Sequence, residues 1–212
     1  PNAIATVVST RVMTPRAAVV LATFFNMLGT LCGTAVAETI GKGIVDLASM
    51  NPDIIIATMI SIILWSCVTV HFGIPTSKSH ELVAGMSGAA LAVAGPSALV
   101  AAGWVKVFWG LILSSFFGFV ISFIMAKCII AGCREITPCT AKFVFGKLQI
   151  VSSMLMALNH GMNDGQKFIG IFSMTLVVAN VLPHFYVPLW VILLCAFTMG
   201  AGTMVGGWKI IK

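Results

Sequence analysis

Long apolar runs dominate the chain, and short polar segments separate them. Four runs lie in the first 126 residues, and each is long enough to cross about 30 Å of hydrocarbon as a helix. These predicted spans are residues 17–37, 54–77, 82–105 and 107–126. A further clean run, residues 189–208, comes near the end of the chain. The pattern predicts an all-α, polytopic membrane bundle.

One apolar region, residues 148–182, does not divide cleanly into spans. It is too long for one ordinary span and short for two, and the polar stretch NHGMNDGQK interrupts it near its middle. An ionisable side chain at the centre of a bilayer costs about 2.5–3.5 kcal/mol on insertion scales. Irregular backbone there must be buried or line a watery cavity. We therefore interpret the stretch as a functional broken helix in preference to a loop at the membrane edge, and we expect broken or re-entrant helices in the bundle.

Basic residues set the predicted orientation of the spans. Residues 127–147 carry four cations against one Glu, which is typical of a cytoplasmic loop. Arg11 and Arg16 place the start of the first span on the same side, and the spans then alternate consistently to Lys209 and Lys212. The chain is 59% hydrophobic and 8% charged, with a net charge of +6. That charge fits cytosolic flanks of membrane spans, so we expect the lipid bilayer as a partner and no nucleic acid.

The first and last apolar runs share a weak sequence echo. Aligned from Thr14 and Val187, they match at five positions. The matches are Pro15 with Pro188, Phe24 with Phe197, Gly29 and Thr30 with Gly202 and Thr203, and Gly33 with Gly206. Because the charge pattern runs the copies in opposite directions, the echo predicts an inverted-topology repeat, a transporter architecture. The predicted units are residues 1–126, a linker over 127–147, and residues 148–212.

A second polar stretch, GIPTSKSHELVAG, follows the second run. Pro75 does not continue the preceding helix comfortably, while Thr76, Ser77 and Ser79 are good caps for a following one. A helix that starts there aims free amides, hydroxyls and the Lys78 ammonium at one point. This arrangement is typical of an anion site. A cytosolic turn with a capped helix behind it is the alternative.

The stretch NHGMNDGQK carries the other candidate site. Asp164 is the only acid between Glu135 and the end of the sequence, and Gly161 and Gly165 lie on either side of it. A helix interrupted there exposes carbonyls from its first half and amides from its second. A carboxylate with nearby carbonyls suits a small hard cation such as Na⁺.

These residues resemble the inorganic phosphate transporter (PiT) family of secondary transporters. NHGMNDGQKFIG, residues 159–170, resembles the second copy of the family signature. IPTSKSHELVAG, residues 74–85, resembles the first of its Pro-x-Ser-Thr-Thr-His segments, with Lys78 where a Thr is usual. PNAIATVVSTRVMTP resembles the residues that follow the first Asn-Asp pair, and GGWKII resembles a Gly-Gly-Trp-Arg stretch. The resemblance covers the whole chain and implies a fragment, with the first Asn-Asp pair before Pro1 and the second Ser/Thr-His segment after Lys212.

The resemblance implies cation-coupled symport of inorganic phosphate, driven by Na⁺ or H⁺, with no cofactor beyond that ion. It places substrate near the midplane of the plasma (inner) membrane, between inverted halves. The residues implied for phosphate are Thr76, Ser77, Lys78, Ser79, Asn163 and Gln166, and those for the coupling ion are Asp164, Asn163 and Asn2. His80 and His160 either carry protons or hydrogen-bond helix ends. Lys78 either holds phosphate or forms a salt bridge with Glu81.

Other functions remain open on the sequence. A permease for sulfate or another oxyanion, with the same fold, is the main alternative. Phosphate can donate a hydrogen bond and sulfate cannot, so a carboxylate facing the anion would favour phosphate. An anion channel and a purely structural subunit are further alternatives. An intramembrane hydrolase would need a Gly-x-Ser-x-Gly motif or paired acids, and the sequence has neither. We therefore expect no enzyme and no metal site beyond the coupling ion, and a homodimer is open.

Overall fold

The structure is a computed structural model that describes residues 2–72, 74 and 76–210, with the backbone alone at residues 2, 41–42, 70 and 206–210. Its long helices are α1 Asn2–Ser9, α2 Pro15–Leu31, α3 Ala35–Gly43, α4 Pro52–Phe72, α5 Lys78–Ala94, α6 Ala101–Gly132, α7 Pro138–His160, α8 Gln166–Val178 and α9 Leu189–Ile210. Shorter segments are η1 Leu47–Ser49, η2 Pro96–Ala98 and the π-helical η3 Gly161–Gly165. Over the described ranges the chain has no strand beyond one isolated bridge. The all-α prediction is confirmed.

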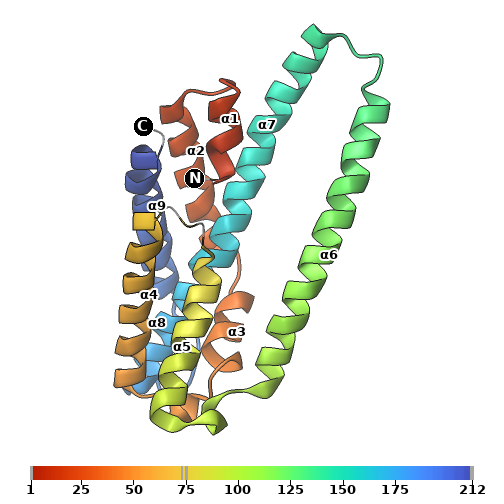
Figure 1. The fold of residues 1–212 in the computed structure, drawn as a ribbon. Helices are drawn as coiled ribbons and strands as arrows, with labels where there is room; N and C mark the ends of the chain where they lie inside the picture. Colours follow the sequence, from red (N-terminus) through yellow and green to blue (C-terminus); the bar gives the residue numbers. More distant parts are fainter. Residues whose placement is uncertain (1, 73, 75, 211–212) are drawn as a thin grey trace.

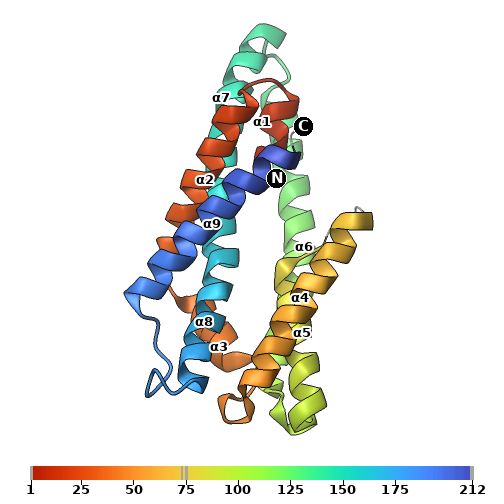
Figure 2. The same cartoon turned by 90° about the vertical axis from the view of Figure 1, so that its left-hand side faces the viewer.

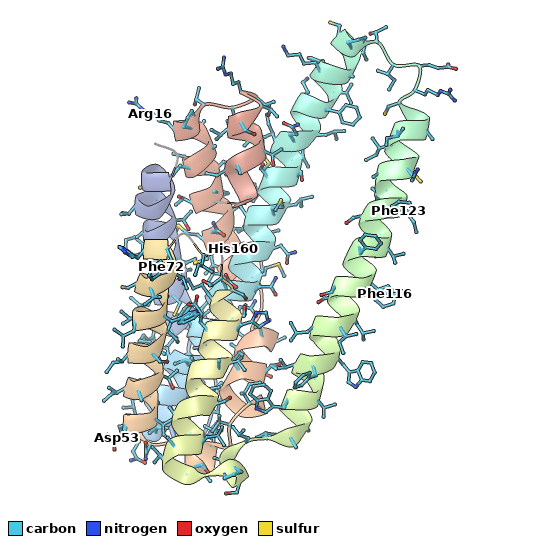
Figure 3. All side chains as sticks on the ribbon, viewed as in Figure 1. Arg16, Asp53, Phe72, Phe116, Phe123 and His160 are labelled. Carbon is cyan, nitrogen blue, oxygen red and sulfur yellow. The ribbon has the colours of Figure 1, made fainter. Side chains whose placement is uncertain are left out.

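The helices form an elongated bundle, and the end that holds the turn between α6 and α7 is called the basic end here (Figure 1). The start of α2, the end of α9 and the turn between α6 and α7 lie toward the basic end. Figure 3 places Arg16 at this end and Asp53 at the other. The described segments that were predicted to be cytoplasmic therefore lie toward one end of the molecule, and Lys212 lies outside the described residues.

The two helices that carry the sequence echo, α2 and α9, pack extensively against each other. They run in opposite directions, because α2 starts and α9 finishes toward the same end of the bundle (Figure 2). At their crossing, Asn26 Nδ2 donates to Thr203 Oγ1 at 3.4 Å. This antiparallel arrangement agrees with the predicted inverted repeat. The repeat boundaries at residues 126 and 148 stay a prediction.

α4 and α5 form a hairpin whose tip lies inside the length of the molecule. In Figure 3 Phe72, the last residue of α4, lies between the levels of Arg16 and Asp53, close to the level of His160. α5 then returns to the end at which α4 began (Figure 1). The pair is a re-entrant hairpin, so the prediction that residues 54–77 and 82–105 are two full spans is wrong, and the alternative of a turn at the cytoplasmic face does not describe its tip.

Several predicted span boundaries are wrong. The predicted span 82–105 is divided, because α5 ends at Ala94 and Gly95 turns the chain with φ +78°. Pro96 then starts η2, and a Gly-Pro pair is strong helix punctuation. α6 begins only at Ala101 and continues well past residue 126. The first span, 17–37, is divided too, at Gly33 with φ +95°.

The predicted loop 127–147 is mostly helical. α6 runs through its first residues to Gly132 and α7 starts at Pro138, so the connection is only residues 133–137. Proline suits the first helical position, and Thr137 Oγ1 accepts from the Thr140 amide at 3.4 Å. The cations that suggested a loop are compatible with helix, since lysine is a good helix former.

The outer surface of this fold is apolar, as expected for a protein surrounded by lipid. α4, the 32-residue α6 and the α7–α8 stretch are long and apolar enough to cross a membrane by length and composition. α6 stands apart from the bundle over most of its length in Figure 1, with Phe116 and Phe123 on it exposed (Figure 3). The main buried cluster instead joins α3, α4, α5 and α8, with Ile44, Ile54, Leu82, Met86 and Met174 almost fully enclosed.

Candidate functional site

The helix does not break at the Asn-Asp stretch, contrary to the prediction. α7 passes into α8 through η3, with helical backbone angles at His160, Gly161 and Gly165. The Gly161 amide donates to the carbonyls of Ala157 and Leu158, so the helical hydrogen bonding of α7 continues into η3. Freed carbonyls and amides of a broken helix are therefore not the feature of this site. π segments of this kind occur often at functional sites.

Glycines bring η3 into backbone contact with α2. A Cβ at Gly161 would overlap the Asn26 carbonyl, and one at Gly165 would overlap the side chain of Thr30. On the other helix, a Cβ at Gly29 would overlap the main chain of Leu158. Thr30 Oγ1 adds hydrogen-bonding contacts to the carbonyls of Asn26, at 2.9 Å, and Gly161, at 3.3 Å. The polar segment is thus fixed against α2 by main-chain atoms.

Asp164 lies between two basic side chains on one face of this helix. Lys167 Nζ is 2.7 Å from Asp164 Oδ1, and His160 Nε2 is 3.2 Å from Asp164 Oδ2. The carboxylate side chain is 22% exposed and the Lys167 side chain 13% exposed. Both carboxylate oxygens are therefore already paired by residues of the same helix.

Lys167 also joins the two polar stretches. Its Nζ donates to Ser79 Oγ in the first turn of α5, at the tip of the hairpin. The predicted anion element and the predicted cation element, 88 residues apart in sequence, thus meet at one ammonium. Lys167 was absent from the predicted site residues. A cation within an apolar region, three residues after Asp164, was the signal that could have found it.

The two ring nitrogens of His160 face acceptors on different helices. Thr203 Oγ1 donates to the Met199 carbonyl at 2.8 Å, so it accepts from Asn26 Nδ2. Asn26 Oδ1 then faces His160 Nδ1 at 2.9 Å, which gives Nδ1 the proton. Because Nε2 faces the Asp164 carboxylate, both ring nitrogens face acceptors. His160 thus links the α2–α9 crossing, through Asn26, to the Asp164 carboxylate.

Glu81 organises the tip of the hairpin. Its side chain is 3% exposed and accepts hydrogen bonds from Thr76 Oγ1 at 2.5 Å, from Ser66 Oγ at 3.0 Å, and from Lys78 Nζ at 2.9 and 3.1 Å. Lys78 Nζ contacts Ser66 Oγ as well, at 2.7 Å. Of the two predicted roles for Lys78, the structure shows the salt bridge. Its side chain is 41% exposed, so the ammonium still reaches the surface of the site.

A cavity of about 550 Å³ opens beside this tip. It is lined by Thr76, Ser77, His80 and Glu81 from the second polar stretch, and by Ser61 and Trp65 from α4. Ser77 is the residue immediately before α5, and its hydroxyl makes no capping hydrogen bond. The start of α5 and the Ser77 hydroxyl, which caps no amide of α5, therefore lie beside this cavity. A larger, mostly apolar cavity of about 780 Å³ borders Asn26, His160 and Gly165.

Three predicted site residues have other contacts or are not described. Gln166 is buried, accepts from the Val36 amide at 3.2 Å and donates to the Cys32 carbonyl at 2.8 Å, so it bridges the connection from α2 to α3. Asn163 Nδ2 bonds to the carbonyl and side chain of Asn159, one turn earlier in the same helix. The side chain of Asn2 lies outside the described residues. Within the described part no group of three His, Cys, Asp or Glu residues could hold a metal ion.

An all-helical membrane bundle with antiparallel related helices and a hairpin that ends at an internal charged site has an architecture typical of membrane transporters. The chain belongs to the phosphate transporter family, whose sequence model matches residues 1–135 and 133–212. This membership confirms the predicted resemblance and favours a transporter over an enzyme.

Individual relatives carry the same description. A Bacillus subtilis (strain 168) protein named "Probable low-affinity inorganic phosphate transporter" is 40% identical over 214 residues, which cover 100% of this chain and 64% of that protein. A Rhizobium meliloti (strain 1021) protein of the same name is 41% identical over 212 residues, covering 99% of this chain and 64% of that protein. The chain thus spans less than two thirds of the length of these relatives.

The fold is also similar to that of a solved structure. That structure is named "The sodium-dependent phosphate transporter", and the match has a TM-score of 0.79 and covers 99% of this chain and 71% of that chain. At 20% sequence identity, the likeness shows the fold. It agrees with the predicted class of a polytopic helical bundle with inverted repeats.

Proposed function

We propose that this chain forms part of a cation-coupled symporter of inorganic phosphate. The observation that carries the proposal is the position of Lys167, which is paired with Asp164 and bonded to Ser79. One side chain therefore reaches both an anion-binding and a cation-binding element. Family membership and the names of the relatives supply the substrate, inorganic phosphate.

The anion site of this proposal lies at the start of α5. The free amides of the first helical turn, the hydroxyls of Ser77 and Ser79, and the ammonium of Lys78 replace water around phosphate. Lys78 and Lys167 supply two positive charges in this region, and Glu81 and Asp164 supply two negative ones. The two ammonium groups complement a phosphate anion, which an apolar site would otherwise strip of its hydration at great cost.

Asp164 is the proposed ligand of the coupling cation. A cation bound there adds a positive charge near the anion site and so lowers the electrostatic cost of placing phosphate nearby, which is the physical basis of coupling. Because the similar solved structure is named sodium-dependent, Na⁺ is the first ion to test, and H⁺ is the second.

Three of the residues first assigned to phosphate take supporting roles in this proposal. Thr76 directs its hydroxyl to Glu81, Gln166 holds the α2–α3 connection, and Asn163 bonds within its own helix. They position the site without touching the anion. Location in the plasma membrane and assembly as a homodimer stay predictions.

Uptake of ³²P-labelled phosphate by the full-length protein in proteoliposomes tests the proposed function. Na⁺ and pH gradients are imposed separately, and unlabelled sulfate is added as a competitor. We expect uptake that rises with one inward cation gradient and that unlabelled phosphate suppresses more strongly than sulfate. Uptake that no cation gradient changes would contradict symport, and stronger suppression by sulfate would favour the oxyanion alternative.

A further inference from the structure

Lys167 occupies the position that a coupling cation would take. Its ammonium lies 2.7 Å from Asp164 Oδ1, and the ring of His160 holds Oδ2. A metal cation that coordinates this carboxylate would lie within a few ångströms of the ammonium and would be repelled by it. Binding of a cation and the present Lys167–Asp164 ion pair therefore exclude one another.

The ammonium already has a second partner in the direction of the anion site. Ser79 Oγ, which accepts from Lys167 Nζ, belongs to the first turn of α5, where amides and hydroxyls gather. Lysine carries its charge on a flexible four-carbon stem, so a small rotation moves the ammonium from Asp164 toward an anion beside Ser79. Lys167 is only 13% exposed, which keeps either interaction largely shielded from water.

We propose that Lys167 is a tethered competitor of the coupling cation, which neutralises Asp164 while the cation is absent and turns to phosphate beside Ser79 when the cation displaces it. The inference rests on the proposed function and names the device that couples its two ligands. Cation binding raises phosphate affinity because the cation takes over the neutralisation of Asp164 and so releases the positive charge of Lys167 to the anion. By linkage, phosphate raises cation affinity by the same factor.

A structural role for Lys167, as a pin between α5 and α8, leads to different expectations. A pin that only holds the helices together would weaken both ligands when it is lost, since both elements would be misplaced. A tethered competitor instead affects the two ligands in opposite directions. The signs of the two changes therefore separate the roles.

The test compares Lys167→Gln with the wild type in the full-length, detergent-solubilised protein. Phosphate binding is measured with ³²P-phosphate over a matrix of Na⁺ concentrations at fixed pH, and over a pH series without Na⁺. For Lys167→Gln we expect the half-saturating cation concentration to fall about tenfold, while the phosphate Kd at saturating cation rises about tenfold. Lys106→Gln, which removes an exposed cation from α6, is the matched control and should change neither.

Lys167→Arg provides a second, independent measurement. Arginine keeps the charge but pairs with a carboxylate through two parallel hydrogen bonds, so it should hold Asp164 more firmly. The half-saturating cation concentration is expected to rise in this variant, opposite to Lys167→Gln. This comparison keeps the proposal testable even if the glutamine variant fails to fold.

The outcomes distinguish the inference from the proposed function. A wild type that binds no phosphate at any cation concentration overturns the proposed function. A wild type that binds phosphate in a cation-dependent manner, with Lys167→Gln weakening both ligands or changing neither, overturns the tethered-competitor role alone. Equal cation dependence in Lys167→Arg and the wild type also counts against it.

Discussion

Lys78 Nζ lies 2.9 Å from Glu81 Oε2, and this ion pair closes the tip of the α4–α5 hairpin. The two partners differ in their environment, since the Glu81 side chain is almost fully enclosed and that of Lys78 reaches the surface. A buried charge that loses its partner is costly, whereas an exposed one regains water. The loss of Lys78 is therefore expected to cost more folding free energy than the loss of Glu81.

This asymmetry predicts which variant is less stable. Lys78→Met leaves the Glu81 carboxylate buried with two hydroxyl donors, while Glu81→Gln leaves an ammonium that can turn to solvent. We expect Lys78→Met to destabilise the protein by about 1–3 kcal/mol more than Glu81→Gln. Thermal unfolding of the detergent-solubilised protein gives the order of melting temperatures. The reverse order would mean that the Glu81 side chain reaches water.

Asp164→Asn tests the carboxylate directly. The substitution keeps size and hydrogen bonding but removes the charge that binds the coupling cation, so phosphate uptake driven by the cation gradient should fall about tenfold or more. Asp164→Glu should be less harmful than Asp164→Ala, because it keeps the charge but misplaces the oxygens. Uptake assays with proteoliposomes measure this, with Glu135→Gln in the exposed turn between α6 and α7 as the control. Normal uptake with normal ion dependence in Asp164→Asn would place the coupling site elsewhere.

The hydroxyls at the start of α5 are expected to contribute unequally to phosphate binding. Ser77→Ala should weaken phosphate uptake about tenfold or more, since a hydrogen bond to a charged partner is worth about 1.5–3 kcal/mol. Thr76→Val should lower the melting temperature through Glu81 and change the phosphate Kd less. Ser97→Ala, in the exposed η2 turn, is the matched control. If Ser77→Ala transported like the wild type, the free hydroxyl beside the cavity would have no part in binding.

Gly161→Ala tests the crossing of η3 over α2. The added methyl group meets the main chain of Asn26, which cannot rotate away, so we expect a loss of about 3 kcal/mol or more, at the upper end of overpacking penalties. Gly118→Ala in α6 has open space around the new methyl group and should be neutral. Both variants are compared by expression level and thermal unfolding. Equal stability of the two would show that η3 can move away from α2.

Both polar elements and the antiparallel direction of α2 and α9 could be predicted from the sequence. Charged and hydroxyl side chains are rare in apolar runs, so GIPTSKSH and NHGMNDGQK are visible without any tertiary information. The antiparallel relation of α2 and α9 followed from the distribution of Arg and Lys at the ends of the runs. These features depend on composition and order along the chain.

Features that depend on contacts between distant segments were not predictable in this way. A re-entrant hairpin and a pair of full spans have the same hydropathy, and α5 differs from a span only in where Gly95 turns the chain. The wrong interpretation of η3 as a break arose because glycine suggests a break, whereas here glycine permits close packing on α2. The Lys167–Ser79 contact and the Gln166 bridge likewise arise only from the tertiary fold.

The contact between η3 and α2 also fixes the position of the charged site along the bundle axis. Gly29 and Gly161 meet main-chain atoms, and main-chain atoms are the same whatever side chains the rest of the bundle carries. Substitution of lipid-facing side chains on α2 or α7 should therefore leave the position of Asp164 along the bundle unchanged. A family of sequences can thus diverge widely on the outside while holding one carboxylate at one level in the membrane.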